Sequence, residues 1–374
     1  MATGPDDLAH LVHDWSEESR AALREHFIPE AAWASPLDSD PGYWIDRTAD
    51  PDRWRSAVYS DTTILTQVDD GGTALTEETA TAGSTPSSSS TAPSLVAAFL
   101  RMLDPYPGDR VLEVGTGTGW TAALLSARLG VDGVVSVEVD DQVAKHAAVN
   151  LERAGFAPHL VVGDGADGWP ERAPYDRVHV TCGVATVPYA WVAQTRPGGV
   201  LAVPWAPNHV SGHRLALTST GNAAVGRIRG DTSFMMLRSQ RLAYPPPADG
   251  RRESAARVDP RRIGRAGRGM EVALAGFLPG VLLNAGLDGA DQVGVRDPGT
   301  RSYAIATGSD GGWEVVQIGP RSLWEELETA YLAWVEWGCP DRGRFGVTVD
   351  AAGQHVWLDR PDNRLAPLEV RADG

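Results

Sequence analysis

The stretch Pro107-Gly-Asp-Arg-Val-Leu-Glu-Val-Gly-Thr-Gly-Thr-Gly119 decides the fold of this chain. Residues 110–114 form a short apolar run that is typical of a buried strand. Gly115, Gly117 and Gly119 follow this run and favour a tight turn into a helix. Glycines in such a turn let the backbone approach a ligand closely, although a turn that only joins strand to helix fits the same letters.

From residue 110 onward, short apolar runs alternate with helical patterns, which predicts a doubly wound parallel sheet. We expect strands over residues 110–114, 133–139, 159–162, 176–182 and 199–204, and helices over residues 119–129, 141–154 and 188–194. Ligands of such sheets bind beyond the carboxyl ends of the strands, where the strand order reverses. The sequence therefore places a binding site at the glycine turn.

Three acidic residues stand at the ends of expected strands. Glu113 precedes the glycine turn, where a carboxylate repels a pyrophosphate but attracts a cationic ligand. Glu138 closes the second strand, where a carboxylate can accept hydrogen bonds from both hydroxyls of a ribose. Asp164 follows the third strand and could accept a hydrogen bond from an adenine amine or merely cap a turn. Together the three residues favour a nucleoside site.

Residues 81–93 are rich in small hydroxyl side chains, and two interpretations stay open. Such residues bury too little surface to offset the entropy of ordering, so the stretch fits a flexible linker. Alternatively, Ser90 or Thr91 caps a helix that has Pro93 in its first turn. Hydroxyls and free N–H groups at a helix N-terminus then form an anion site, and a carboxylate is the ligand we expect there.

The N-terminal part predicts an amphipathic helix over residues 6–26, irregular Trp- and Pro-rich structure up to residue 54, and a strand over residues 62–68. The C-terminal part predicts hairpins over residues 213–228 and 345–358 and a helix over residues 323–337. Trp324, Trp334, Trp337 and Trp357 of this part belong to a core or line a peptide groove.

Seven arginines between residues 251 and 268 stand against Glu253 and Asp259, so this segment is basic within an acidic protein. A solvated flexible loop and a surface that docks an acidic peptide both explain such a patch.

Composition limits the class of protein. At 374 residues, with 42% apolar and 22% charged residues, the chain is long enough for two domains with a core each. The net charge of −16 argues against nucleic acid as a partner. Cys182 and Cys339 lie far apart and no His cluster accompanies them, so neither a disulfide nor a metal site is predicted. No signal or membrane segment is evident, and we expect a cytoplasmic monomer without a membrane partner.

Several motifs together resemble the protein-L-isoaspartate O-methyltransferase family. The family's Phe-Val-Pro segment is similar to Phe27-Ile28-Pro29, and its Thr-Ile-Ser-x-Pro signature matches Ser89-Ser90-Thr91-Ala92-Pro93 in part. Thr91 stands where the family has its substrate-facing serine, and Ser90 replaces the isoleucine. The resemblance covers about residues 20–215. Its other motifs are Glu113-Val-Gly-Thr-Gly-Thr-Gly119, Val137-Glu138, Val162-Gly-Asp-Gly165, Gly168-Trp-Pro170, Ala173-Pro-Tyr-Asp176 and Arg196-Pro-Gly-Gly199.

This resemblance implies an α/β fold, the Rossmann-like class I methyltransferase fold, with an N-terminal helical cap (residues 1–85), a core (86–215) and an additional C-terminal α+β domain (216–374). The implied cofactor is S-adenosyl-L-methionine, with S-adenosyl-L-homocysteine as product. The implied cofactor residues are Glu113, Gly115, Thr116, Gly117, Thr118, Gly119, Glu138, Val139, Asp164 and Gly165. Thr91, helped by Ser89 or Ser90, would donate hydrogen bonds to the acceptor carboxylate.

The repair enzymes of this family are compact, whereas this chain continues from residue 216 to residue 374. The extension and the serine-rich stretch are similar to the lanthipeptide- and graspetide-associated methyltransferases, which tailor ribosomally made peptides. That resemblance implies methylation of an aspartate side chain in a modified precursor peptide, then a succinimide (aspartimide) and isoaspartate. The alternative is a repair methyltransferase that acts on isoaspartate in damaged proteins.

Overall fold

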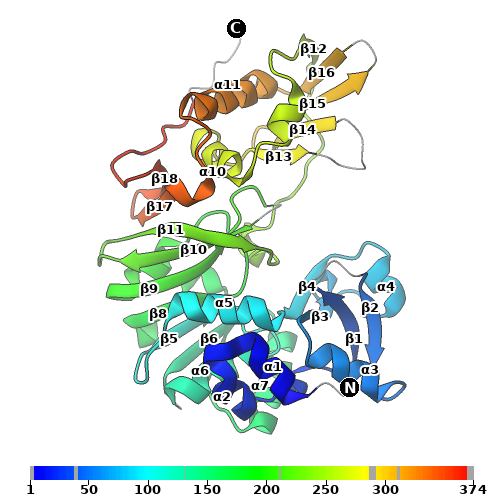
Figure 1. Ribbon diagram of the computed structural model, residues 1–374, viewed down its shortest axis with the longest axis vertical. Helices are drawn as coiled ribbons and strands as arrows, with labels where there is room; N and C mark the ends of the chain where they lie inside the picture. The colour runs from blue at the N-terminus through cyan, green and yellow to red at the C-terminus, as the bar shows by residue number, and fades with distance from the viewer. Residues whose placement is uncertain are drawn as a thin grey trace.

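The computed structural model describes residues 4–37, 41–130, 132–209, 212–285, 292–309 and 312–368. Three sheets of four, nine and five strands organise these residues (Figure 1). The four-stranded sheet lies beside the nine-stranded one, and the five-stranded sheet lies at the far end of the molecule, near the C-terminus.

The nine-stranded sheet has the order β18-β17-β11-β10-β9-β8-β5-β6-β7. Its parallel part consists of β5 (Val111–Val114), β6 (Val134–Glu138), β7 (His159–Val162), β8 (Tyr175–Val180) and β9 (Thr195–Trp205). The helices along this part are α5 (Pro93–Leu103), α6 (Trp120–Leu129), α7 (Asp141–Ala154) and α8 (Tyr189–Ala193). The predicted doubly wound α/β fold is therefore confirmed, and the order reverses between β5 and β8.

Side chains of the central strands alternate between two buried layers, as the period of a strand requires. Val111 and Val134 face the layer that contains α5, α6 and the N-terminal helices, whereas Leu112 and Val135 face the opposite layer. Both faces of these strands are covered, which explains why they read as continuous apolar runs in the sequence.

The predicted C-terminal hairpins are confirmed. β10 (Gly212–Ser219) pairs with β11 (Ala223–Thr232), and β17 (Phe345–Asp350) pairs with β18 (Gly353–Leu358). Because β11 also pairs with β17, the last hairpin of the chain extends the nine-stranded sheet. The boundary expected after residue 215 thus falls inside β10, in the middle of this sheet.

A five-stranded antiparallel sheet occupies the rest of the C-terminal part, in the order β12-β16-β15-β14-β13. Its strands are β12 (Arg251–Ala255), β13 (Leu282–Ala285), β14 (Gln292–Asp297), β15 (Ser302–Ser309) and β16 (Gly312–Ile318), and its helices are α9 (Pro260–Gly264), α10 (Arg268–Phe277) and α11 (Leu323–Glu336). The helix predicted over residues 323–337 is thereby confirmed.

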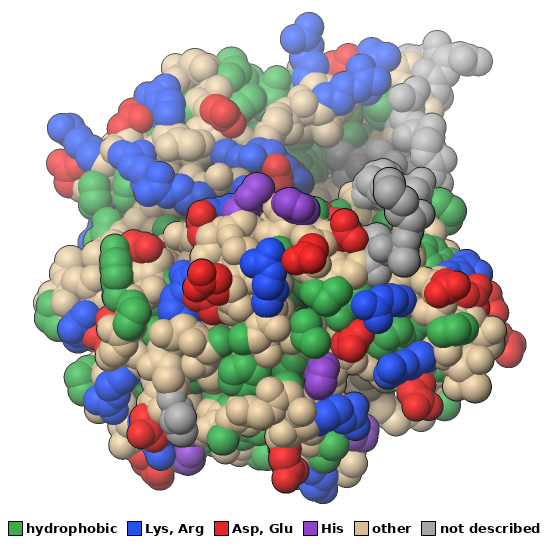
Figure 2. All heavy atoms as spheres, turned by 60° about the horizontal axis from the view of Figure 1, so that its bottom comes forward, with side chains coloured by type: hydrophobic (Ala, Val, Ile, Leu, Met, Phe, Trp, Pro, Cys, Tyr) green, Lys and Arg blue, Asp and Glu red, His purple; other side chains and the backbone are tan. Residues whose placement is uncertain are grey.

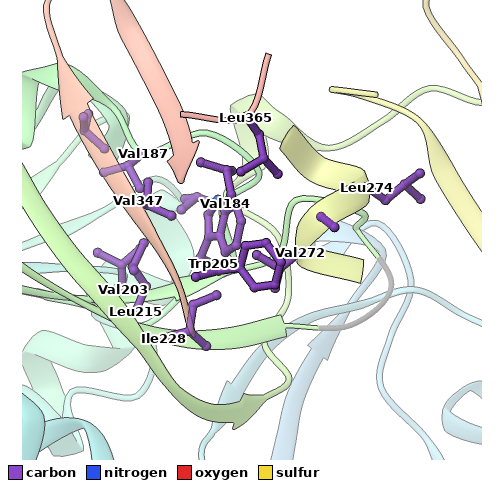
Figure 3. Packing of buried hydrophobic residues seen from close by; sticks show 14 of the residues in the cluster. Val184, Val187, Val203, Trp205, Leu215, Ile228, Val272, Leu274, Val347 and Leu365 are labelled. Carbon is purple, nitrogen blue, oxygen red and sulfur yellow. The ribbon is translucent and has the colours of Figure 1, made fainter. Parts of the chain in front are cut away.

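The nine-stranded sheet and the five-stranded sheet share one apolar core through α10. Figure 3 shows Trp205 of β9 close to Val184 and Val272, while Leu274 of α10 points away from this group. All four side chains are at most 2% exposed and belong to one buried cluster that reaches from β5 to α11. The C-terminal part is therefore packed against the central sheet as well as connected to it.

The N-terminal part differs from the prediction in two places. The single helix expected over residues 6–26 is broken into α1 (Pro5–Val12), η1 (His13–Trp15), α2 (Ser16–Ala21) and η2 (Arg24–Phe27). The break follows α1, where His13 has a positive φ of 37° that a continuing helix cannot contain. The irregular region up to residue 54 instead holds the paired strands β1 (Ala31–Pro36) and β2 (Tyr43–Asp46) and the start of α3 (Pro51–Val58).

Hydroxyl-rich residues 81–93 also form regular structure. They contain the end of α4 (Glu77–Thr81) and the strand β4 (Pro86–Ser90), which pairs with β3 (Thr62–Val68). The strand expected over residues 62–68 is thus confirmed, and neither a linker nor a capping loop describes residues 86–90. The sequence missed β4 because its pairing partner lies about twenty residues upstream, so local composition carried no sign of it.

Most arginines of the basic segment are bonded within the protein. Arg257 pairs with buried Glu328 at 2.7 Å, and Arg252 donates to backbone carbonyls. Figure 2 shows acidic and basic side chains next to one another over much of one face.

Three of the four C-terminal tryptophans belong to the core. Trp324, Trp334 and Trp357 are buried, whereas Trp337 is exposed.

Among the described residues, no helix is long and apolar enough to cross a membrane. No group of three or more His, Cys, Asp or Glu side chains in the described ranges is arranged to hold a metal ion.

Candidate active site

A cavity of about 360 Å³ lies beyond the carboxyl ends of β5, β6 and β8, at the point where the strand order reverses. Ten of the predicted site residues line it, namely Ser89, Ser90, Thr91, Gly115, Thr116, Gly117, Thr118, Glu138, Val139 and Gly165. Glu113, Gly119 and Asp164 lie next to the cavity but not on its wall. The structure thus brings together the two stretches that the sequence singled out separately.

The glycine turn adopts a backbone conformation that other residues avoid. Gly115 has a φ of +95°, and a Cβ atom there would lie 2.4 Å from Oγ1 of Thr181. Gly117 has a φ of +55°, and a Cβ atom there would lie 3.3 Å from the carbonyl oxygen of Ser89. The turn therefore needs glycine for its conformation and for its close approach to β4.

Glu138 forms part of the cavity wall at the end of β6. Its Oε2 accepts a hydrogen bond from the Gly117 N–H at 2.9 Å, and its Oε1 accepts one from the Asp140 N–H at 3.1 Å. Burial raises the pKa of this carboxyl group, and the backbone N–H groups oppose the rise. The carboxylate joins the glycine turn to the N-terminus of α7.

Glu113 lies beneath the cavity and is completely buried. Ser136 donates a hydrogen bond to its Oε2 at 2.6 Å, and Oγ of Ser136 lies 2.6 Å from Oγ1 of Thr116. Oε1 has no hydrogen-bond partner among the described residues. Burial raises the pKa of Glu113 to about 8, so the group is largely protonated at neutral pH. Thr116 lines the cavity, so two hydroxyls connect it to this carboxyl group.

Of the two roles predicted for Asp164, the structure shows the cap of a turn. Its Oδ1 accepts a hydrogen bond from the Ala166 N–H at 2.9 Å and caps the turn η4 (Gly165–Asp167). The side chain is exposed and does not line the cavity, whereas Gly165 does. A role for Asp164 toward a ligand stays a prediction.

The hydroxyl residues line the opposite wall as a strand and not as a helix cap. The N-cap of α5 is Ala92, so the predicted capping by Ser90 or Thr91 is wrong. The Ser94 N–H in the first turn instead donates to Oδ1 of Asp61 at 2.9 Å. Residues 86–91 all contribute to the cavity lining. Ser88 and Ser90 are buried, whereas Ser89 and Thr91 are half-buried, and these two hydroxyls have no hydrogen bond to a described residue.

A buried guanidinium holds this wall in place. Arg24 is 0% exposed, and it donates to the carbonyl oxygens of Val58, Thr62, Ser90 and Thr91 at 2.8–3.2 Å. Burial lowers its pKa to about 9, which leaves it charged at neutral pH. Sequence reasoning missed Arg24, because a lone arginine in a helical pattern looks like a solvated residue.

A third segment, residues 233–241, was also missed. Seven of its residues line the cavity, namely Ser233, Phe234, Met235, Met236, Leu237, Arg238 and Arg241. The backbone of Gly183 holds it at the end of β8, through hydrogen bonds to Met235 and Leu237 of 2.8 Å each. Its sequence has no glycine turn or acidic motif, so no local signal marks it as part of a site.

Comparison with known proteins gives consistent results. The family model for protein-L-isoaspartate(D-aspartate) O-methyltransferase (PCMT) matches residues 51–239. The protein-L-isoaspartate O-methyltransferase of Pyrococcus horikoshii is 43% identical over 120 residues, which are 32% of this chain and 54% of that protein. The one of Hyperthermus butylicus is 31% identical over 202 residues, which are 51% of this chain and 76% of that protein.

A solved structure titled protein-L-isoaspartate O-methyltransferase aligns with 96% of this chain and 100% of its own, with a TM-score of 0.55 and 24% identity. The fold of the C-terminal part thus has a counterpart in a protein of that name. In sequence, the chain spans about half the length of the first curated relatives that it matches. With half of its residues matched by the family model, and 76% of the Hyperthermus protein covered, the chain belongs to the protein-L-isoaspartate(D-aspartate) O-methyltransferase family.

Proposed function

We propose that the chain is an S-adenosyl-L-methionine-dependent carboxyl O-methyltransferase that acts on a protein or peptide. The observation that supports this most strongly is the cavity itself, which has a glycine turn and a carboxylate on one wall. On the other wall it has two hydroxyls that form no hydrogen bond to a described residue. The family membership supports the same activity.

The glycine-turn wall suits a nucleoside that carries a cationic methionine moiety. Gly115 and Gly117 let the turn backbone lie close to Thr181 and Ser89 at the cavity, and Glu138 offers its oxygens to ribose hydroxyls. The buried Oε1 of Glu113, which lacks a partner among the described residues, provides negative charge for an ammonium once that carboxyl group ionises. When bound, S-adenosyl-L-methionine supplies an electrophilic methyl group.

The hydroxyl wall suits the acceptor. A carboxylate is ionised at neutral pH, so it needs no general base, and the protein must instead hold it in line with the methyl group. Among the described residues the Thr91 and Ser89 hydroxyls have no hydrogen-bond partner, so they can donate to a carboxylate oxygen. Arg24 keeps the strand in position through the Ser90 and Thr91 carbonyls. Phe234 and Met236 give this end of the cavity an apolar lining that restricts water.

For the acceptor we propose the free carboxylate of an isoaspartyl residue, because the family and the relatives carry that substrate in their names. The second candidate is an aspartate side chain in a modified, ribosomally made peptide. It is favoured by the hydroxyl wall, where Ser90 and Thr91 replace the isoleucine and serine of the family signature. The C-terminal part does not distinguish the two, since its fold has a counterpart in a structure titled as the isoaspartate enzyme.

Both candidates predict the same chemistry after transfer. The ester carbonyl is attacked by the nitrogen of the neighbouring backbone amide, which loses its proton, and methanol leaves as a five-membered succinimide forms. Hydrolysis of that ring then gives aspartate or isoaspartate.

Intact-mass analysis of matched peptides tests the proposal. Four peptides of one sequence would be incubated with S-adenosyl-L-methionine, with isoaspartate, aspartate, asparagine or a ring-constrained aspartate at the same position. Gain of one methyl group followed by loss of methanol on the isoaspartyl peptide supports the first acceptor, and the same gain on the constrained aspartyl peptide alone supports the second. No methylation of any peptide, with S-adenosyl-L-homocysteine bound in calorimetry, contradicts a carboxyl acceptor.

A further inference from the structure

Five side chains outside the glycine turn connect the two walls of the cavity. Gln67 lies near the end of β3, and Asp70 lies in η3 (Asp69–Gly71), which follows β3. Asp140, Arg238 and Arg241 belong to the central fold. We define these five residues as the latch. It is the ionic link between the tip of the β3–β4 hairpin and the nucleoside end of the cavity.

The latch is a chain of alternating charges. Nη2 of Arg238 lies 3.0 Å from Oδ1 of Asp70 and 3.1 Å from Oδ2 of Asp140. Arg241 contacts both carboxylate oxygens of Asp70, at 2.8 and 2.7 Å. Gln67 donates to Oδ2 of Asp140 at 3.4 Å. The charges of the two carboxylates and the two guanidinium groups thus cancel, and Asp70 forms ion pairs with both arginines.

The hairpin tip holds Asp70 in a restrained backbone. Asp69 and Asp70 have positive φ values of 49° and 54°, which cost energy in residues other than glycine. The Thr85 N–H donates to Asp69 at 2.8 Å, and the Asp70 N–H donates to Oγ of Ser87 at 3.1 Å. These bonds tie the turn to the start of the serine strand, so we expect this end of the strand to follow Asp70 when Asp70 moves.

Two latch residues of the central fold, Asp140 and Arg238, are connected by hydrogen bonds to the residues that we expect to hold a nucleoside. Asp140 donates its backbone N–H to Glu138, and Ser239, next to Arg238, donates to Asp164 at 3.3 Å. A Cβ atom added at Gly165 would lie 3.9 Å from Cδ1 of Leu237 in the same segment. The segment is anchored independently by the backbone bonds of Gly183, so it stays in place when Asp70 leaves.

We propose that the tip of the β3–β4 hairpin is a gate over the cavity and that opening of the latch controls the exchange of S-adenosyl ligands. The inference rests on the proposed function for the identity of the ligand. The charged side chains of the latch are between 10% and 40% exposed, which makes the ion pairs weak enough to break and sensitive to salt. When the latch opens, the hairpin tip and the start of the serine strand move away from Arg238 and Arg241, while Arg24 keeps Ser90 and Thr91 in place. The cavity then becomes accessible from this end.

The test measures the dissociation rate of S-adenosyl-L-homocysteine from the full chain, by displacement in a stopped-flow instrument with tryptophan fluorescence as the signal. Asp70→Asn removes the charge that joins both arginines, and asparagine tolerates the left-handed conformation of this turn. We expect dissociation to be about fivefold to tenfold faster, because two partly exposed pairs are lost. Raising the salt from about 0.05 M to about 0.5 M should accelerate the wild type and leave the variant almost unchanged.

Asp359→Asn is the matched control, because it breaks the similarly exposed pair of Arg344 and Asp359 beside β17 and β18, away from the cavity lining. Unchanged dissociation in Asp70→Asn, or equal acceleration in both variants, overturns the gate. If the wild type does not bind the ligand at all, the proposed function fails and the gate fails with it. Ligand binding with unaltered rates leaves the proposed function intact and removes only the gate.

Discussion

The two walls of the cavity are built in opposite ways. The cofactor wall, which we propose binds the S-adenosyl ligand, consists of β5, the glycine turn, α6 and β6, which follow one another in the chain and pack as a local unit. The acceptor wall, which we propose binds the carboxylate, is assembled from β3 and β4. Buried Arg24 of η2 connects these strands through the carbonyl oxygens of Thr62 and Ser90, each more than thirty residues from it in sequence. The first wall depends on backbone conformation, whereas the second depends on long-range polar contacts.

The largest effect should come from the centre of the acceptor wall. Arg24→Met keeps the side-chain volume but leaves the carbonyls of Val58, Thr62, Ser90 and Thr91 without their donor. We expect a loss of about 3–5 kcal/mol in the free energy of unfolding. Urea denaturation measures it, with Arg20→Met as control, since the exposed pair of Arg20 and Asp6 should be worth less than about 1 kcal/mol. Equal stability of the two variants would show that Arg24 does not hold the wall.

A substitution in the glycine turn should weaken the binding of S-adenosyl-L-homocysteine. Gly115→Ala adds a Cβ atom 2.4 Å from Oγ1 of Thr181 at a φ of +95°, so we expect a loss of about 2–4 kcal/mol in S-adenosyl-L-homocysteine binding, or about 30-fold to 1000-fold. Gly163→Ala is the control, because its backbone is not in the left-handed region and no atom lies within 4 Å of the added Cβ. Calorimetry on both variants would contradict this account if Gly115→Ala bound as tightly as the control.

The buried carboxyl group of Glu113 should make stability depend on pH. Its pKa is raised from 4.5 to about 8 by burial, so between these values the unfolded chain releases a proton that the folded chain keeps. This group therefore lowers the free energy of unfolding by about 1.4 kcal/mol for each pH unit between about 5 and 8.

Glu113→Gln removes this contribution, so the variant should lose less stability than the wild type between pH 5.5 and pH 7.5. Denaturation curves at the two pH values measure the difference, which should be about 2–3 kcal/mol. Parallel pH dependence in the two proteins would mean that Glu113 is already ionised in the folded state.

The contrast between the walls also explains what the sequence could predict. Strand, turn and helix signals are local, so the sequence predicted the glycine turn at the end of β5 and Glu138 at the end of β6. β4 was missed because serines have low strand propensity and its ladder depends on β3. Arg24 was missed because its partners are backbone carbonyls, which every sequence contains. Residues 233–241 are held at the site by pairing with Gly183 and by ion pairs with Asp70 and Asp140, all of which are distant in sequence.

The central claim is that the walls divide the work, with cofactor binding on one and acceptor binding on the other. Thr91→Ala tests it most directly when the affinity for S-adenosyl-L-homocysteine and the methyl-transfer rate are measured on one preparation. Thr81→Ala is the control, since the Thr81 hydroxyl donates to the Glu77 and Glu78 carbonyls of α4 and lies outside the cavity lining. We predict an affinity within about twofold of the wild type and a transfer rate about tenfold lower, as expected for one lost hydrogen bond to a charged group. An equal loss of affinity and rate, or no loss of either, would contradict the division.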